Sequence, residues 1–372
     1  KKIYQVAMPH FSKEDSDWIK SKVDKVLFDR LSTGPFVKEF EEKFAKFVGT
    51  KFAVALNSCT SALEISINYL NLKPGDEVIV PVQTFIATGT AVTSQGGKIV
   101  FAEINKDTFC LDLQEIKKKV NSKTRAIMLV HFSGYLAFDS LEIKKFCKEN
   151  KIFLIEDCAH AVGSSIDGIV AGNIGDVGCF SFFSTKTITT GEGGMLTTNN
   201  ESLFNLAKSL RERGRDWSHP TEIYDKSWRN CRIPEFSAIL GINQLSHIDE
   251  IINHRSEVTK IYDEYISKSE KFTTLPRKNN INYSLWKHIT LIEENGDREK
   301  LQSKLKNDFG ININWAYSPA LHLQPLYIKT LKNKEGMFPE SEKIMQRHFH
   351  LPLHMKISIE DAHFIGQSLI KC

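Results

Sequence analysis

The sequence predicts an α/β protein with a large, mostly parallel sheet domain and a smaller C-terminal α+β domain. Between about residues 50 and 200, short apolar runs alternate with helical patterns, as in a parallel sheet that is covered on both faces. After about Pro234 a long helical pattern and a mixed segment follow. The 372 residues exceed the roughly 250–300 at which single cores stop growing, so two domains are expected.

The expected elements of the large domain follow one another in regular order. Strands are predicted at 52–56, 77–80, 98–101, 126–132, 152–155 and 178–183, and helices at 60–70, 85–94, 112–120 and 138–149. Asp112 and Glu115 have the spacing of a capping box at the start of the third of these helices. In such sheets ligands gather at the carboxyl ends of the strands, where we expect 57–61, 83–85, Asp157 and 181–186 to meet.

The C-terminal part begins with a helical pattern from Ile239 to Ile266, which we expect to bridge the two domains. Beyond it the sequence predicts a strand at 286–292, a helix at 298–309 and a loop at 315–327 that is rich in Tyr, His and Pro. We therefore expect a large domain over residues 1–245 and a smaller one over 246–372.

Composition excludes several classes of protein. The formal net charge of +4 is too small to indicate nucleic-acid binding. The seven cysteines are scattered and odd in number, which argues against a disulfide framework and against a structural zinc site. No apolar stretch approaches the roughly 20 residues that cross a membrane. We expect a cytoplasmic protein with no metal, no nucleic acid and no membrane among its partners.

Lys186 is the first candidate for chemistry. It closes the run Cys-Phe-Ser-Phe-Phe-Ser-Thr-Lys, and the turn Gly-Glu-Gly-Gly follows at 191–194. Burying a lysine is costly unless it is neutralised, and a desolvated amine has the lowered pKa that a nucleophile needs. Upstream, Asp157 ends an apolar strand. A lysine for a Schiff base, an aspartate for a pyridinium nitrogen and a Ser/Thr-rich phosphate turn indicate a pyridoxal phosphate enzyme.

Each supporting residue also has a plainer interpretation. The helix start at 57–62 could hold a phosphate through Thr60 and Ser61, or it could be an ordinary N-cap. Asp157 alone would more readily cap the next helix. His160 could bind the cofactor ring hydroxyl or Asp157, or be a buried structural histidine. Phe85 could stack on the ring or pack in the core.

Eight segments in the same order resemble the DegT/DnrJ/EryC1/StrS sugar aminotransferases across nearly the whole chain. They are Gly-Pro-Phe-Val-Lys-Glu-Phe-Glu (34–41), Asn-Ser-Cys-Thr-Ser-Ala-Leu (57–63), Pro-Val-Gln-Thr-Phe-Ile-Ala-Thr (81–88), Glu-Asp-Cys-Ala-His-Ala-Val-Gly (156–163), Phe-Ser-Phe-Phe-Ser-Thr-Lys with Gly-Glu-Gly-Gly (180–194), Asn-Cys-Arg-Ile (230–233), Leu-His-Leu-Gln-Pro-Leu-Tyr (321–327) and Leu-Pro-Leu-His (351–354). The resemblance implies an aspartate-aminotransferase-like fold (fold type I) and a homodimer with shared active sites.

The resemblance also implies a role for each site residue. Lys186 would form the Schiff base with pyridoxal 5'-phosphate and move the proton between the donor and the cofactor. Asp157 would pair with the ring nitrogen and His160 with the ring oxygen. The remaining implied residues are Thr60, Ser61 and Ser181 on the phosphate, Phe85 stacked on the ring, Asn230 on the phosphate of the partner's cofactor, and Glu192, Arg232 and His322 at the substrate.

The chain departs from the family pattern at two places. Residues 228–233 read Trp-Arg-Asn-Cys-Arg-Ile where the family commonly has Gly-Tyr-Asn-Tyr-Arg-Met, and residues 132–134 read Phe-Ser-Gly in place of Leu-Tyr-Gly. Both places are expected to contact the substrate or the partner, so the sugar stays open. The lysine at 186 disfavours the related dehydratases, which have histidine there.

These features predict an aminotransferase that alternates between pyridoxal phosphate and pyridoxamine 5'-phosphate. It would take the amino group from an amino acid, with glutamate as the expected donor, and transfer it to a keto- or aldehydo-sugar that is linked to a nucleotide. Its products would enter surface polysaccharides or glycoconjugates. The alternatives are a pyridoxal phosphate-dependent sugar dehydratase on the same fold and a catalytically silent cofactor-binding regulator.

Overall fold

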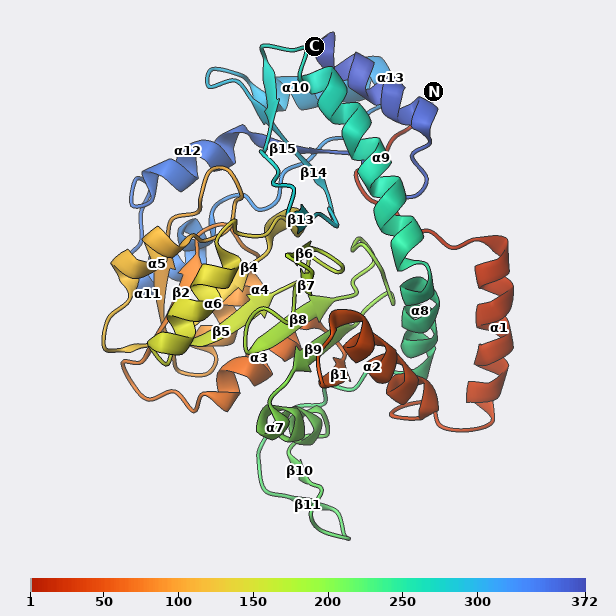
Figure 1. The fold of residues 1–372 in the computed structure, drawn as a ribbon, viewed down its shortest axis with the longest axis vertical. Helices are drawn as coiled ribbons and strands as arrows, with labels where there is room; N and C mark the ends of the chain where they lie inside the picture. Colours follow the sequence, from red (N-terminus) through yellow and green to blue (C-terminus); the bar gives the residue numbers. More distant parts are fainter. Residues whose placement is uncertain (1) are drawn as a thin grey trace.

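The computed structural model describes residues 2–372, which form a seven-stranded sheet with helices on both faces and a smaller C-terminal part (Figure 1). The strand order is β1-β9-β8-β5-β4-β2-β3. The strands are β1 (Phe52–Leu56), β2 (Glu77–Pro81), β3 (Lys98–Ala102), β4 (Thr124–Val130), β5 (Phe153–Asp157), β8 (Val177–Ser181) and β9 (Gly194–Thr198). Only β9 runs opposite to the rest of this sheet, because it pairs antiparallel with both β1 and β8. The predicted mixed, mostly parallel sheet is confirmed.

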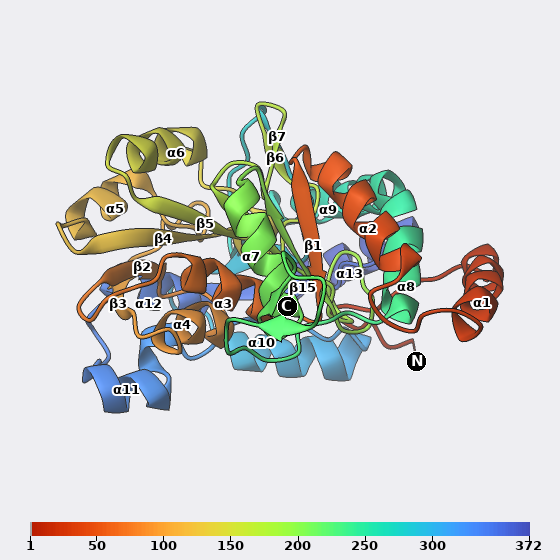
Figure 2. The same cartoon turned by 90° about the horizontal axis from the view of Figure 1, so that it is seen from below.

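Helices cover both faces of the sheet because its strands are apolar on both sides. Along β4, Ala126 and Met128 pack on one face, and Ile127 and Leu129 on the other. The first face contacts α3 (Cys59–Tyr69), α4 (Ile86–Thr93) and α7 (Glu201–Arg211). The second face contacts α5 (Leu113–Lys119) and α6 (Ser140–Glu149). Near β1 and β9, it is covered by α2 (Pro35–Val48) and α8 (Glu235–Ser246). Figure 2 shows α5 and α6 on one side of the strands, with α3 and α4 on the other.

The C-terminal part adds a three-stranded antiparallel sheet in the order β12-β14-β15. Its elements are α9 (Ile248–Ile266), β12 (Phe272–Thr274), β14 (His288–Ile292), α10 (Arg298–Lys304), a π-helical turn (Leu305–Phe309), a 3-10 turn (Leu321–Leu323), α11 (Pro325–Leu331), α12 (Pro339–Arg347), β15 (His348–Leu351) and α13 (Ile359–Ile370). Ile289 and Phe349 of this part share one core with Ile127 and Leu129 of the large sheet. The division at residues 245 and 246 stays a prediction.

Smaller elements complete the described chain. They are α1 (Lys13–Leu27), a 3-10 turn (Phe132–Gly134), a three-stranded ribbon of β6 (Ser165–Ile166), β7 (Ile169–Val170) and β13 (Ile281–Asn282), and the hairpin β10 (Arg215–Asp216) and β11 (Ile223–Tyr224). The hairpin projects from the body of the molecule at the end opposite the two termini (Figure 1). Within residues 2–372, no helix combines the length and the apolar character that a membrane span requires.

The predicted continuous helix from Ile239 to Ile266 is wrong, because the chain breaks at His247. This residue has φ −104° and ψ 10°, which ends α8 before α9 begins. Its ring lies 2.9 Å from a carboxylate oxygen of Asp15 on α1, an interaction with a helix more than 200 residues away in the chain. The apolar periodicity continues across the break, so the pattern alone gave no sign of it.

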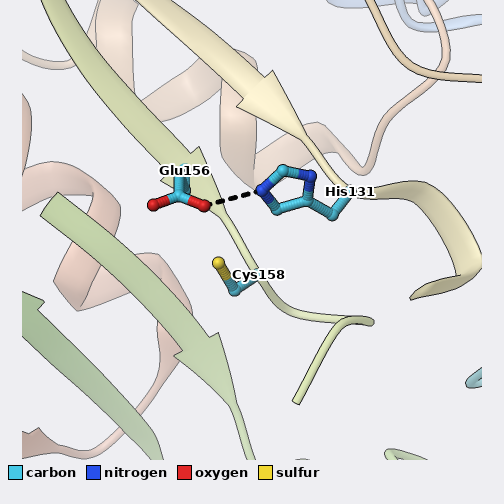
Figure 3. Close-up of side chains that lie close together, drawn as sticks. All are labelled: His131, Glu156 and Cys158. Carbon is cyan, nitrogen blue, oxygen red and sulfur yellow. Dashed lines mark hydrogen bonds and ion pairs between the residues drawn. The ribbon is translucent and has the colours of Figure 1, made fainter. Parts of the chain in front are cut away.

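Glu156 anchors the carboxyl end of β5 from inside the protein. Its carboxylate accepts hydrogen bonds from the backbone N–H groups of Gly172, Ile174 and Gly175 at 2.9, 2.8 and 2.7 Å. It also lies 2.8 Å from Nε2 of His131, which follows β4 (Figure 3). Both carboxylate oxygens are thereby engaged by protein donors. Glu156 thus joins the ends of two central strands to the loop before β8.

His131, Glu156 and Cys158 place metal-ligating types of atom within 4.8 Å of one another (Figure 3). All three side chains are buried. The four donors around Glu156 explain its burial without an ion, because a buried carboxylate needs hydrogen bonds or charge partners. Burial raises the pKa of the Cys158 thiol well above its ordinary value, which keeps the thiol protonated. We interpret the cluster as a structural anchor.

Replacing Glu156 with glutamine should lower the free energy of unfolding by about 2–4 kcal/mol. The new amide group would point N–H donors at backbone N–H donors that are already buried. Chemical denaturation followed by circular dichroism measures the change, with Glu149→Gln on the exposed surface of α6 as the control. Equal stability of the two variants would contradict the anchoring role.

Candidate active site

A cavity of about 410 Å³ opens at the edge of the large sheet where the parallel strands end. Residues that follow β1, β2, β5 and β8 line one side of it, and residues 286–287 and 316–317 of the C-terminal part line the other. The four segments that the sequence assigned to this edge therefore meet in one place. The volume falls within the roughly 300–1,000 Å³ of small-molecule sites.

Lys186 projects into this cavity from the loop between β8 and β9. Burial lowers the pKa of its amine to about 8, while Cys59 and Asp157 act in the opposite sense. The amine nitrogen lies 4.3 Å from the ring centre of Trp286. With this pKa roughly a tenth of the Lys186 amine is neutral and nucleophilic at pH 7, far more than for an ordinary exposed lysine.

Asp157 lies opposite, at the last position of β5, where strand alternation turns it away from Glu156. One carboxylate oxygen accepts a hydrogen bond from the Thr88 hydroxyl at 2.8 Å, and the other accepts from the Ala159 N–H at 3.2 Å. Burial raises the pKa of Asp157, against these hydrogen bonds and the charge of Lys186. A positive partner in the cavity would therefore stabilise the ionised carboxylate.

His160 is held in one tautomer at the wall of the cavity. Its Nδ1 accepts a hydrogen bond from the Ser133 N–H at 3.2 Å, so the proton of the neutral ring is on Nε2. Nε2 lies 3.1 Å from the hydroxyl of Tyr317, and the ring stacks on Trp286 with 3.9 Å between ring centres. Burial and the charges of Lys186 and Lys287 hold the pKa of His160 well below its ordinary value.

The amino end of α3 faces the same cavity, and the backbone of β9 packs closely against it. The Ser58 hydroxyl caps the helix by accepting from the Ser61 N–H at 3.2 Å. Gly194 of β9 lies so close to the Ser58 backbone that a Cβ there would come within 2.2 Å of it. Thr60 lines the cavity, whereas the Ser61 hydroxyl donates to Asn57 at 2.7 Å and is not part of the lining. Free N–H groups at a helix start bind anions such as phosphate.

The remaining predicted cavity residues lie at its walls and rim. Ser181 is buried at the end of β8 and lines the wall. Phe85 is 50% exposed, far more than a core residue, and its ring centre lies 5.2 Å from that of Tyr317. Glu192 is an exposed lining residue. The core interpretation of Phe85 is therefore wrong, since the ring borders the cavity.

Besides Ser61, three predicted residues lie outside the cavity lining. Arg232 pairs with Glu212 at 2.8 Å, which neutralises its charge. His322 is fully buried, and its Nε2 lies 3.0 Å from Glu342, so hydrogen bonding and core packing explain it. Asn230 is exposed on the surface, and its predicted contact with a partner's cofactor stays a prediction. The structure does not bring Arg232 or His322 to the candidate site.

Sequence reasoning missed four residues of the site, namely Thr88, Trp286, Lys287 and Tyr317. Thr88 ends the segment 81–88 that resembles the family, but the sequence assigned it no role at the site. The other three come from segments about 100 residues or more beyond Lys186, where no strand-end argument applied. The dense Tyr, His and Pro content of 315–327 was the only signal for Tyr317.

These groups fit pyridoxal phosphate. The cavity presents an amine for the aldehyde, a carboxylate for the ring nitrogen, aromatic faces for the ring, and a helix amino end with hydroxyls for the phosphate. The raised pKa of Asp157 marks a buried carboxylate without a cationic partner of its own, which a protonated ring nitrogen would supply.

Comparison with known proteins agrees with this geometry. The chain is 31% identical over 373 residues to the GDP-perosamine synthase of Escherichia coli O157:H7, covering 99% of this chain and 97% of that protein. PseC of Helicobacter pylori, an aminotransferase involved in the biosynthesis of pseudoaminic acid, matches with a TM-score of 0.92 and 26% identity over 100% of this chain and 99% of that one. The PLP form of Spr1654 from Streptococcus pneumoniae matches with a TM-score of 0.90 and 26% identity over 100% and 98% of the two chains, and a PMP form matches as well.

The solved structures confirm the predicted aspartate-aminotransferase-like fold of type I. The model that describes the DegT/DnrJ/EryC1/StrS aminotransferase family matches residues 14–370. A match of this length, with a relative more than 30% identical over nearly the whole chain, establishes the family. The chain belongs to the DegT/DnrJ/EryC1/StrS aminotransferase family.

Proposed function

We propose that this protein binds pyridoxal phosphate in the cavity and transfers an amino group from an amino acid to a nucleotide-linked keto- or aldehydo-sugar. Glutamate is the proposed amino donor. The observation that carries the proposal is that the Lys186 amine, with its lowered pKa, and the Asp157 carboxylate line one cavity. Family membership supports the reaction class. A GDP-perosamine synthase and an aminotransferase of pseudoaminic acid biosynthesis, both similar over nearly the whole chain, support a sugar acceptor.

Each side chain that lines the cavity has a proposed role that follows from its position. When bound, pyridoxal phosphate supplies an electron sink for the carbon that loses or gains a proton. Asp157 holds a proton on the ring nitrogen, and Thr88 and the Ala159 N–H orient its carboxylate. Lys186 attaches the cofactor and then moves the proton as a neutral amine.

The other wall residues position the ring and the phosphate. His160, in its fixed tautomer, would contact the ring oxygen, Phe85 would cover one face of the ring, and Thr60, Ser181 and the amino end of α3 would hold the phosphate. Glu192 borders the mouth through which the sugar enters.

We propose that two copies of the chain form a homodimer that shares its active sites. The hairpin of β10 and β11 extends from the body of the chain (Figure 1), and its Trp217, Ile223 and Tyr224 are exposed aromatic or apolar residues. Asn230 lies shortly after this hairpin on an exposed strand bridge to Glu212. Exposed apolar side chains of this kind mark interaction surfaces. The proposed products enter surface polysaccharides or glycoconjugates.

The absorption spectrum of the protein with pyridoxal phosphate, before and after glutamate, tests the proposal. We expect a visible band of the lysine-bound cofactor that glutamate converts to the pyridoxamine form. Lys186→Ala should remove the band and lower turnover by at least about 10²–10⁴-fold, the range of a lost general base. The exposed Lys144→Ala should retain both. A band that glutamate leaves unchanged would favour the dehydratase or the silent regulator.

Asp157→Asn should keep the visible band but lower the rate of the glutamate half-reaction by about 10²–10³-fold. The amide cannot hold a proton on the ring nitrogen, so developing negative charge is stabilised less. Rapid-mixing absorption measurements with glutamate give this rate. A rate within a few-fold of the wild type would exclude Asp157 as the ring-nitrogen partner.

The rate at which the visible band forms should rise with pH until about 8 and then level off. Burial lowers the pKa of Lys186 to about 8, so the reactive neutral amine increases up to this pH. Below it, the rate should fall roughly tenfold per pH unit. Mixing apoprotein with the cofactor over pH 6 to 10 gives the profile; a rise that continues to the ordinary lysine pKa near 10.5 would contradict a buried amine.

A further inference from the structure

Lys287 is a second buried amine in the same cavity, and it has no role in the proposed reaction as described above. It precedes β14, is 6% exposed and contributes to the cavity lining. Its amine lies 4.2 Å from the ring centre of Trp286, the ring that the Lys186 amine approaches at 4.3 Å. The two nitrogens therefore cannot be farther apart than the sum of these distances. Lys287 lies within reach of a molecule that reacts at Lys186.

No carboxylate of residues 2–372 pairs with the Lys287 amine, whose one polar contact is the Asn314 side-chain oxygen at 3.3 Å. Other buried cations have more acceptors. Arg255 donates to three backbone carbonyls, and Arg298 donates to two. A buried ammonium group with one amide acceptor is poorly compensated, so an anion that binds beside it would stabilise the charged form.

Lys186 is the ionisable group whose charge acts on Lys287, and it carries no negative charge. The Lys287 charge helps to lower the pKa of His160, His348 and His350, each of which burial already lowers. These rings are therefore neutral near pH 7. An anion that enters the cavity would meet Lys287 as a cation without a competing carboxylate partner.

The α-carboxylate of an amino acid donor is the anion that fits this position. It is bonded to the carbon that reacts beside Lys186, so it must lie within a few bond lengths of that amine. The diphosphate of a nucleotide-linked sugar is attached to the anomeric carbon and lies several bonds from a carbonyl elsewhere on the ring. Among the described lining residues there is no arginine, and the cation-capable side chains are Lys186, His160 and Lys287.

We propose that Lys287 binds the α-carboxylate of the amino donor and thereby selects amino acids over other amines. This inference rests on the proposed function, because Lys186 is assigned to the cofactor. It makes Lys287 a specificity-determining residue of the first half-reaction and leaves the sugar half-reaction without a need for its charge.

Proton binding should accompany donor binding. Burial and the charge of Lys186 lower the pKa of Lys287 to about 7, so about half of the amine is protonated at neutral pH. A carboxylate at contact distance favours the charged form and raises this pKa. Near pH 7 Lys287 should therefore add part of a proton to the proton balance of donor binding, and its contribution to affinity should weaken as pH rises above 7.

The test uses the cofactor-loaded protein and 2-methylglutamate, which has the donor's carboxylates but no α-hydrogen to transfer. Titrations of the cofactor band give its dissociation constant, and calorimetry in two buffers of different ionisation enthalpy gives the proton uptake. The variants are Lys287→Met, which keeps the length without charge, and Lys287→Arg, which is charged at every pH. Lys271→Met, an exposed lysine near β12, is the matched control.

We expect Lys287→Met to bind 2-methylglutamate about 10–100-fold more weakly, the range for a lost charge-assisted hydrogen bond. Its proton uptake should be smaller than that of the wild type by the share of Lys287. Lys287→Arg should retain binding but lose this share of the proton uptake, and Lys271→Met should match the wild type. With reactive donors, the wild type should discriminate against the α-amide of glutamate, and Lys287→Met should lose this discrimination while its kcat/KM for the sugar is unchanged.

Wild-type affinity in Lys287→Met, retained discrimination against the α-amide, or a loss confined to kcat/KM for the sugar would each overturn the assignment. Equal proton uptake by the wild type and Lys287→Met would do so as well. If the wild type forms no visible band with pyridoxal phosphate, both this inference and the proposed function fail. If the band and its response to glutamate are normal, only the role of Lys287 is at risk.

Discussion

The hydrogen bonds around Glu156 at the end of β5 are the constraint on which the candidate site depends. Successive side chains of a strand point to opposite faces, so fixing Glu156 on one face directs Asp157 to the other. The three backbone donors from 172–175 hold the loop that precedes β8, whose end leads to Lys186. One buried carboxylate therefore determines both the direction of Asp157 and the position of the strand that carries the lysine.

Low polarity in the cavity gives its ionisable groups their separate roles. Burial lowers the pKa of both lysine amines and raises that of Asp157, so each charged form becomes dependent on a partner. In the proposed reaction Lys186 would gain its partner through covalent attachment, Asp157 through a protonated ring nitrogen, and Lys287 through a substrate carboxylate. An enzyme that alternates between two substrates needs such charges, because each is compensated only when the correct molecule is present.

Local sequence patterns were sufficient for the large sheet but not for all of the C-terminal part. Apolar runs and turn signals located β1 to β5 and β8 within a few residues, since each strand is buried on both faces. The break at His247 was missed because the apolar period continues across it. The π-helical turn at 305–309 was likewise included in a predicted α-helix, since its residues keep the same apolar spacing.

The sequence by itself determined the family, the sheet and the residues at the strand ends. The carboxyl ends of parallel strands lie at the same edge of a sheet, so residues that follow such strands can be assigned to that edge from the sequence. The sequence placed Lys186, Asp157, Phe85 and Thr60 at one edge, and the structure has them around one cavity. Only the tertiary structure decided that Arg232 is neutralised by Glu212 and that Trp286, Lys287 and Tyr317 complete the wall. Such contacts join segments far apart in the chain, and neither periodicity nor local spacing records which distant side chains will meet.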